Sequence, residues 1–266
     1  MRNIVKNIEL IAACLLFNAC LEKFDIPLNS AGKPQVVIEG MVTNETPRQW
    51  VRVSLTNQNA GSNLSTPVND ASVYLSDDSG QYRQLAHSGQ GLYVIDSFYG
   101  QVNHEYTLKV NYDNREYIST EKMNPAGTID SVIVIYKKGD VLYKKGFYLN
   151  VYATKASMQT NYSRATISVN DSLYNNYENL LVIDDSYTTP NQQFTIPYAF
   201  EVHDSVEIKV FSLSENVYNY YYQLLQLTEN FYNRSQLILN PPSNISGGSL
   251  GFFQVSEVKR TTVVIP

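Results

Sequence analysis

The segment from Gly247 to Gly251 has the Gly-x-Ser-x-Gly spacing of a serine nucleophile elbow. An elbow requires a buried strand before the serine, a helix after it and a general-base histidine later in the chain. Here a proline pair precedes the segment, strand-forming residues follow it, and all three histidines (His87, His104 and His203) come earlier. The pattern therefore does not predict a serine hydrolase.

The sequence also lacks the spacing of a zinc site. The histidines are far apart and form no His-x-x-x-His or Glu-x-x-His pattern. The carboxylate doublets Asp77-Asp78 and Asp184-Asp185 stand beside turn residues, where such side chains cap backbone donors. Each doublet supplies few oxygens for calcium, although calcium and a glycosidase pair stay open as alternatives. We expect no enzyme activity, no metal and no cofactor.

Cys20 is the residue with the most specific chemistry, because an export signal precedes it. Arg2 and Lys6 give a positive start, the apolar run from Leu10 to Phe17 follows, and Ala19 is the small residue before the cysteine. The run is too short to span a bilayer as a helix. The pattern predicts cleavage before Cys20 and attachment of acyl chains to its thiol, which anchor a protein stably. The alternatives are an ordinary secretory signal, or a first helix in which Cys20 is a buried thiol.

The mature chain would begin with a polar tether. Cleavage of residues 1–19 removes the second cysteine, Cys14, so neither a disulfide nor a cysteine metal site remains. Residues 20–35 are polar and contain two prolines, which suits a lipidated tether. The net charge of −5 and the scattered lysines and arginines indicate no nucleic-acid partner.

Residues 36–122 have the alternation and turn spacing of an immunoglobulin-like or transthyretin-like β-sandwich. The turns include Asp77-Asp78-Ser79-Gly80 and Asp113-Asn114. Seven strands are expected between the turns: Val36 to Val42, Trp50 to Leu55, Ala71 to Leu75, Tyr82 to Ala86, Gly91 to Ile95, Tyr106 to Tyr112 and Glu116 to Ser119.

Residues 123–266 are expected to form a second β-rich domain, after a linker of breaker residues from Met123 to Gly127. One amphipathic helix, residues 214–231, follows Ser212, whose spacing to Glu215 matches a capping box. Strands are expected at Ile129 to Tyr136, Phe147 to Ala153, Arg164 to Val169, Leu180 to Ile183 and Ser205 to Leu213. The chain is therefore predicted to be mainly β, with two β-sandwich domains, the second carrying one amphipathic helix.

Tyrosine is the compositional outlier, with 21 Tyr against 10 Phe and one Trp. Most tyrosines of a β protein occupy strand or core positions, but Tyr also stacks on sugars and peptides. Three helix tyrosines fall partly off the apolar stripe, and the glycine-rich segment from Asn244 to Phe253 suits a shaped loop that packs against a domain or a partner. The candidate residues for ligand or partner contact are Tyr218, Tyr220, Tyr222, Asn244, Gly247, Gly248 and Phe252.

Several segments carry a family resemblance. They are Val37-Ile38-Glu39-Gly40, Gly91-Leu92-Tyr93, the signal that ends in Cys20, and Asn244-Ile245-Ser246-Gly247-Gly248 followed by Gly251-Phe252. With them, essentially the whole chain resembles the Bacteroidota lipoprotein family filed as domain of unknown function 4249. Ser249 and Leu250 depart from the tighter glycine spacing of that family. The order of the strands in residues 36–122 is similar to that of carboxypeptidase-regulatory-like β-sandwiches, which have no chemistry of their own.

The resemblance implies an outer-membrane lipoprotein beside a TonB-dependent transport barrel, and it brings no catalytic residues. The charged residues directly after Cys20 resemble the surface-export signal of Bacteroidota lipoproteins, which implies display on the cell surface rather than retention on the periplasmic leaflet. Asp-Ser-apolar triplets resemble the O-glycosylation acceptor pattern of the same phylum. They mark Ser131, Ser172 and Ser205 as candidate acceptors.

We expect a non-enzymatic accessory of a TonB-dependent uptake system, one that binds substrate or caps the barrel. The alternative is a cell-surface adhesion or envelope-structural lipoprotein, which needs no pocket. A discrete pocket lined by tyrosines between the two sandwiches would favour the first function, and flat sides with charged edges the second. Converging carboxylates or a histidine pair would indicate an enzyme.

Overall fold

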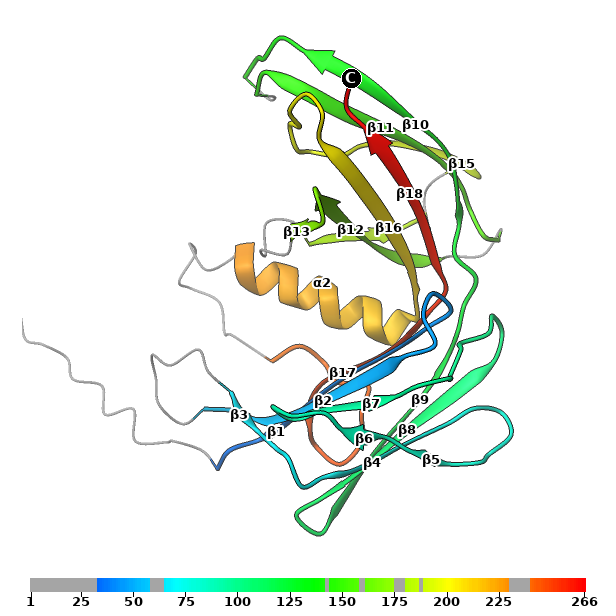
Figure 1. Cartoon of the computed structure of the whole chain (residues 1–266), viewed down its shortest axis with the longest axis vertical. Helices are drawn as coiled ribbons and strands as arrows, with labels where there is room; N and C mark the ends of the chain where they lie inside the picture. Colours follow the sequence, from blue (N-terminus) through cyan, green and yellow to red (C-terminus); the bar gives the residue numbers. More distant parts are fainter. Residues whose placement is uncertain are drawn as a thin grey trace, which may run out of the picture. The chain divides into compact units, whose positions relative to one another are not determined.

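The computed structural model of the 266-residue chain describes residues 33–57, 65–141, 144–157, 161–174, 180–186, 189–229 and 240–266. The predicted signal peptide, Cys20 and most of the predicted tether lie outside these residues. The described part is mainly β, with four sheets and one helix, α2 (Glu215–Glu229) (Figure 1). Residues 34–266 form one compact unit.

Two sheets form the first sandwich. One has the strand order β17-β1-β2-β7-β6, with β3 paired to β2, and the other has the order β5-β4-β8-β9. The bounds of the first sheet are β17 (Leu250–Ser256), β1 (Val36–Thr43), β2 (Gln49–Leu55), β3 (Thr66–Pro67), β6 (Ala86–His87) and β7 (Leu92–Ile95). Those of the second are β4 (Ser72–Ser76), β5 (Arg83–Gln84), β8 (Glu105–Tyr112) and β9 (Arg115–Lys122).

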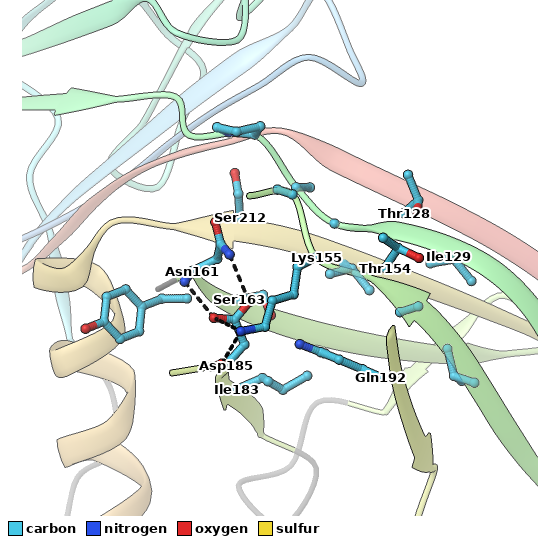
Figure 2. A pocket seen from close by; sticks show the side chains of 18 of the residues that line it. Thr128, Ile129, Thr154, Lys155, Asn161, Ser163, Ile183, Asp185, Gln192 and Ser212 are labelled. Carbon is cyan, nitrogen blue, oxygen red and sulfur yellow. Dashed lines mark hydrogen bonds and ion pairs between the residues drawn. The ribbon is translucent and has the colours of Figure 1, made fainter. Parts of the chain in front are cut away.

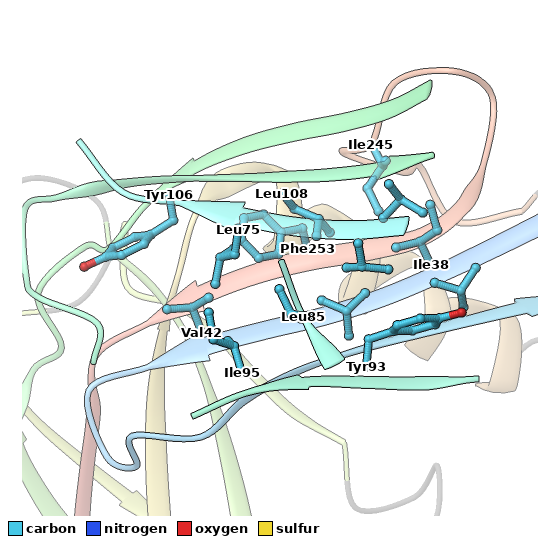
Figure 3. Close-up of a cluster of buried hydrophobic side chains, with 14 of the residues drawn as sticks. Ile38, Val42, Leu75, Leu85, Tyr93, Ile95, Tyr106, Leu108, Ile245 and Phe253 are labelled. Atoms are coloured by element: carbon cyan, nitrogen blue, oxygen red, sulfur yellow. The ribbon is translucent and has the colours of Figure 1, made fainter. Parts of the chain in front are cut away.

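The core of the first sandwich lies between these two sheets. Ile38 and Val42 from β1 meet Leu75 and Leu108 from the opposite sheet, as Figure 3 shows, and all four are almost completely buried. Their spacing follows the period of two along a strand, which turns alternate side chains inward. Burial of each such side chain stabilises the fold by roughly 1.5–3 kcal/mol, so this packing dominates the stability of the domain.

Two further sheets form the second sandwich. Their orders are β10-β11-β15 and β13-β12-β16-β18, with β14 paired to β12. The core between them includes Leu149, Val151, Ile167 and Ile208. The bounds are β10 (Thr128–Lys137), β11 (Gly146–Thr154), β15 (Asn191–Thr195), β12 (Tyr162–Val169), β13 (Ser172–Tyr174), β14 (Leu181–Asp184), β16 (Ser205–Leu213) and β18 (Val258–Val264).

The buried tyrosines explain much of the tyrosine enrichment. The ring of Tyr93 is in the first core, and its hydroxyl donates to the carbonyl oxygen of Val68 at 3.0 Å and accepts from the N–H of Ala71 at 2.9 Å. The hydroxyl of buried Tyr148 likewise donates to the carbonyl oxygen of Lys144 at 2.9 Å. A core tyrosine is tolerated when its hydroxyl is paired in this way.

The predicted boundary at residue 123 needs one correction. β17 pairs in parallel with β1, and Ile245, Phe253 and Val255 are buried in the core of the first sandwich. Residues 245–256 therefore belong to the first sandwich rather than the second. β17 completes a sheet whose other strands lie far away in sequence. No pattern in residues 245–256 themselves indicates that β17 pairs with β1.

The predicted helix cap also needs correction. The N–H of Val217 donates to the hydroxyl of Ser214 at 3.3 Å, so Ser214 is the cap. Ser212 is still within β16, and its hydroxyl donates to the carbonyl oxygen of Asn124 at 2.6 Å. α2 begins at Glu215, and the predicted helical residues 230–231 lie outside the described residues.

Polar contacts join the two sandwiches. The carboxylate of Glu45, after β1, lies 2.9 Å from the ammonium of Lys209 on β16. The side-chain oxygen of Asn44 accepts from the N–H of Val258 at 2.8 Å, and the carboxylate of Glu257 accepts from the N–H of Ala126 at 2.8 Å. These bonds tie the first sandwich, the linker and the second sandwich together.

Candidate functional site

A polar cleft of about 400 Å³ opens where the first sandwich, the linker and the second sandwich meet. We call it the junction cleft. Its volume is within the range of small-molecule binding sites. The lining side chains come from the ends of strands and from connections: Asn103, Lys122 and Asn124 on one side, and Ser157, Asn161, Tyr162 and Glu215 on the other.

Tyr162, at the wall of the cleft, begins a ladder of three stacked tyrosines. Its ring stacks on that of Tyr218 with centroids 4.6 Å apart and planes 27° apart. Tyr218 in turn stacks on Tyr222, with centroids 5.7 Å apart and planes 20° apart. The two helix residues are four positions apart and therefore share one face of α2. Tyr222 is 47% exposed, so this tyrosine ladder runs from the cleft to the surface.

The hydroxyls of Tyr162 and Tyr218 remain protonated donors at neutral pH. Burial raises the pKa of Tyr162, and the negative charges of Glu215 and Asp184 raise it further. Burial is also the main reason for the raised pKa of Tyr218, followed by the charge of Asp184. A neutral phenol both donates and accepts hydrogen bonds, which suits recognition of a polar ligand.

A second, smaller cavity of about 50 Å³ lies behind Asn161, within the second sandwich. Figure 2 shows Lys155, Asn161 and Asp185 converging beside it. This volume has room for a few water molecules and is too small for a substrate. The cavity and the junction cleft share Asn161 and Tyr162 as lining residues, so the smaller cavity supports the wall of the larger one.

The carboxylate of Asp185 holds that wall in place. It accepts from the backbone N–H of Asn161 at 2.8 Å and from the side-chain amide of Asn161 at 2.9 Å. The ammonium of Lys155 lies 3.5 Å from the same carboxylate and donates to the carbonyl oxygen of Asp185 at 2.6 Å. Both charged side chains are 8% exposed. This buried pair fixes Asn161, and through it the neighbouring Tyr162.

The glycine-rich segment makes contacts within the molecule. Asn244 is bonded to the backbone of Phe253, and Phe252 packs against Tyr220 and Tyr221 at centroid distances of 4.9 and 5.2 Å. A Cβ on Gly247 would lie 2.7 Å from the carbonyl oxygen of Glu116. A Cβ on the exposed Gly248 would meet no other atom within 4 Å.

The serine of the elbow-like pattern has no elbow geometry. β17 follows Ser249 directly, where an elbow would have a helix. The side chain of Ser249 is buried, and its hydroxyl makes no hydrogen bond in the described part of the chain. Among the same residues, no group of three or more His, Cys, Asp or Glu side chains is arranged to hold a metal ion.

The profile of the family described as domain of unknown function (DUF4249) matches residues 21–262. The chain belongs to this family. No curated protein matches it. Among solved structures, the Yersinia pseudotuberculosis adhesin InvE shares 11% identity over 86% of this chain and 58% of its own, with a TM-score of 0.23. The BSP domain of a biofilm-associated protein shares 11% identity over 85% of this chain and 29% of its own, with a TM-score of 0.24. This DUF4249 chain thus spans less than two thirds of either structure.

The predicted contact residues of this DUF4249 protein divide into two groups. Tyr218 and Tyr222 belong to the tyrosine ladder, whereas Tyr220 turns inward, and burial raises its pKa to about 12. Sequence reasoning missed Tyr162. Period-two alternation along β12 places Tyr162 on the same face as Arg164, whose guanidinium lies over the ring of Tyr221, but no local pattern pairs Tyr162 with α2.

The candidate acceptors of O-glycosylation are all exposed. Ser131 is in β10, Ser172 begins β13 and Ser205 begins β16. An acceptor hydroxyl has to be reachable from solvent, so glycosylation of this DUF4249 protein at these positions stays a prediction that suits the fold. In the described part of the chain, no helix is both long and apolar enough to cross a membrane.

Proposed function

We propose that this DUF4249 protein is a lipid-anchored outer-membrane protein and a non-enzymatic accessory of a TonB-dependent uptake system. Acyl chains on Cys20 hold it in the membrane, and residues 20–35 lift the folded part off the cell surface. In this proposal the source is a member of the Bacteroidota, and the first sandwich is a carboxypeptidase-regulatory-like domain without chemistry of its own.

The observation that carries the proposal is the junction cleft with its tyrosine ladder. A protein that only spaces or braces the envelope needs no pocket, whereas an accessory that delivers a substrate needs one with polar groups and aromatic faces. The cleft offers amides, hydroxyls and a tyrosine ring. Binding is therefore the activity that its chemistry supports best.

The alternative, a cell-surface adhesion or envelope-structural lipoprotein, is favoured by a different observation. β10 is an edge strand of its sheet, and Ile133 and Tyr136 on it are 48% and 50% exposed. Edge strands with exposed apolar side chains pair readily with other chains. Such pairing would serve adhesion without any use of the cleft.

Co-purification separates the two functions. The tagged lipoprotein is extracted from its native outer membrane in mild detergent, and the proteins that accompany it are identified by mass spectrometry, with Cys20→Ala as the control. Recovery of a TonB-dependent barrel with the wild type and its loss with Cys20→Ala supports the accessory role. Recovery of the lipoprotein alone supports the alternative.

A further inference from the structure

We propose that the junction cleft binds a neutral, hydroxyl-rich ligand, and that this ligand is an oligosaccharide. The inference rests on the proposed function, because it names the class of substrate that the accessory would hold. Three features of the cleft support it: the balance of charge, the unpaired polar groups, and the tyrosine ladder that begins at its wall.

The charge of the lining is balanced. Lys122 and Glu215 are the charged residues that line the cleft. Neither forms an ion pair with another described residue, and both are exposed. An anionic ligand such as a phosphate would gain one cation and face one anion, so electrostatics give it little net attraction. A neutral ligand meets no such conflict.

The polar groups of the lining match hydroxyls. The side chain of Asn103 makes no hydrogen bond with another described residue. The amide nitrogen of Asn124 donates to the carbonyl oxygen of Leu213 at 3.3 Å, which leaves its oxygen as an acceptor. An amide carries a donor and an acceptor side by side, the arrangement that pairs with neighbouring hydroxyls of a sugar. The phenol of Tyr162, kept neutral, adds a group that both donates and accepts.

The tyrosine ladder supplies oriented aromatic surface. Tyr162 lines the cleft, and stacking on Tyr218 fixes its ring before any ligand arrives. Tyr222 presents a half-exposed ring at the outer end. The C–H faces of sugar rings pack on such surfaces, and rings ordered in advance lose little entropy on binding. One sugar unit can therefore pack against Tyr162 in the cleft and another against Tyr222 at the outer end.

A peptide is the competing ligand class. Extended peptides bind mainly by adding a strand to an exposed sheet edge, with main-chain hydrogen bonds. The polar groups of the cleft are side chains at strand ends, in connections and at the helix start. This arrangement favours an oligosaccharide over an extended peptide.

The test is calorimetric titration of the detergent-purified full-length lipoprotein. The probes are neutral oligosaccharides of glucose, xylose, mannose and N-acetylglucosamine, with oligogalacturonate as the acidic probe and trialanine as the peptide probe. We expect at least one neutral oligosaccharide to bind. Tyr162→Ala should weaken that binding by about tenfold, the ratio that corresponds to the loss of one good aromatic contact.

Three further variants keep the result independent of folding. Tyr162→Phe retains the ring and should bind within about threefold of the wild type, because its loss is limited to one hydrogen bond of modest net strength. Tyr222→Ala, at an exposed position, should weaken binding of the longer oligosaccharides more than of the shorter ones. Tyr136→Ala removes a tyrosine of similar exposure on β10 and should leave binding unchanged.

The inference is overturned if trialanine or oligogalacturonate binds in place of the neutral sugars. Absence of binding to every neutral probe, or equal binding by the wild type, Tyr162→Ala and Tyr222→Ala, also overturns it. If a barrel co-purifies but no neutral sugar binds, the accessory role stands and the proposed ligand class is wrong. If a neutral sugar binds but no barrel co-purifies, the ligand class stands and the accessory role is wrong.

Discussion

The side-chain amide of Asn244 pairs with the backbone of Phe253. Its nitrogen donates to the carbonyl oxygen of Phe253 at 2.8 Å, and its oxygen accepts from the N–H of Phe253 at 2.9 Å. The same nitrogen also donates to the carboxylate of Glu121 at 2.7 Å, and Glu121 is 4% exposed. Asn244 thus closes the segment before β17 onto the strand itself and satisfies a buried carboxylate.

Replacing Asn244 should destabilise the protein. Asn244→Ala leaves the carboxylate of Glu121 and both backbone groups of Phe253 without this partner, so we expect a loss of about 2–4 kcal/mol in the free energy of unfolding. Urea denaturation of the wild type and the variant measures it. Asn219→Ala, at an exposed position on α2, is the matched control and should change stability by less than about 0.5 kcal/mol. Equal effects of the two changes would contradict the structural role.

The glycines before and within β17 should differ sharply in their tolerance of alanine. Gly251 has φ +94°, and a Cβ there would lie 2.0 Å from the carbonyl oxygen of Ile38 on β1. Gly248 has φ +78° and no atom within 4 Å of the added Cβ. We expect Gly248→Ala to cost about 1 kcal/mol through backbone strain, and Gly251→Ala to cost several times more. Thermal unfolding of both variants measures this difference in stability. Similar melting temperatures would argue against the pairing of β17 with β1.

Breaking the buried ion pair should be far more costly than breaking an exposed one. Asp185→Asn leaves the ammonium of Lys155 buried without its counter-charge, which costs roughly 3–5 kcal/mol. Asp96→Asn removes the partner of Arg48 in a pair whose side chains are 68% and 60% exposed, and should cost less than about 1 kcal/mol. Chemical denaturation of Asp185→Asn and Asp96→Asn compares their free energies of unfolding. A small effect of Asp185→Asn would mean that Asp185 does not hold the wall of the junction cleft.

Alkaline pH should lower stability through Tyr221. Burial raises its pKa from 10.0 to about 12, and its hydroxyl donates to the side-chain oxygen of Gln254 at 3.0 Å. The folded form keeps the proton while the unfolded chain loses it, so the contribution is fully present below pH 10 and is lost between about pH 10 and 12. Tyr221→Phe should make the unfolding free energy less dependent on pH in that window. An unchanged pH profile would mean that Tyr221 is not desolvated.

Much of the fold was predictable because its signals are local. The alternation of Ile38, Gly40 and Val42 marked β1, and the Asp113-Asn114 pair marked a hairpin turn, where both residues have positive φ. Predictions of this kind depend on neighbours along the chain. They located most of the longer strands, and they located the start of the helix to within one residue.

The parts that sequence reasoning missed depend on distant partners. The return of β17 to β1 joins segments about two hundred residues apart, and no local pattern specifies it. The same pairing explains why the candidate contact residues Asn244, Gly247 and Phe252 are engaged within the molecule. Glycine and amide residues at a conspicuous spacing fit a binding loop and a buried closure equally well until the packing is known.

The role of Tyr162 in the candidate site likewise depends on a contact between residues far apart in sequence. It stands at the start of β12, 56 residues before Tyr218, and only the fold brings the two rings to a 4.6 Å stack. The high tyrosine content predicted that some tyrosines contact a ligand or partner, without indicating which ones. Which tyrosines line a cavity depends on the packing of α2 against β12 and on the bonds of Asp185 to Asn161.

Quantitative co-purification from the native outer membrane distinguishes an accessory of a TonB-dependent barrel from a lipoprotein that acts without one. The lipoprotein and its Cys20→Ala variant are expressed at equal levels, and every accompanying outer-membrane protein is measured relative to the bait. We expect one TonB-dependent barrel in near-stoichiometric amount with the wild type and its loss with Cys20→Ala. A wild-type lipoprotein that is acylated, membrane-bound and recovered without any such barrel would contradict it.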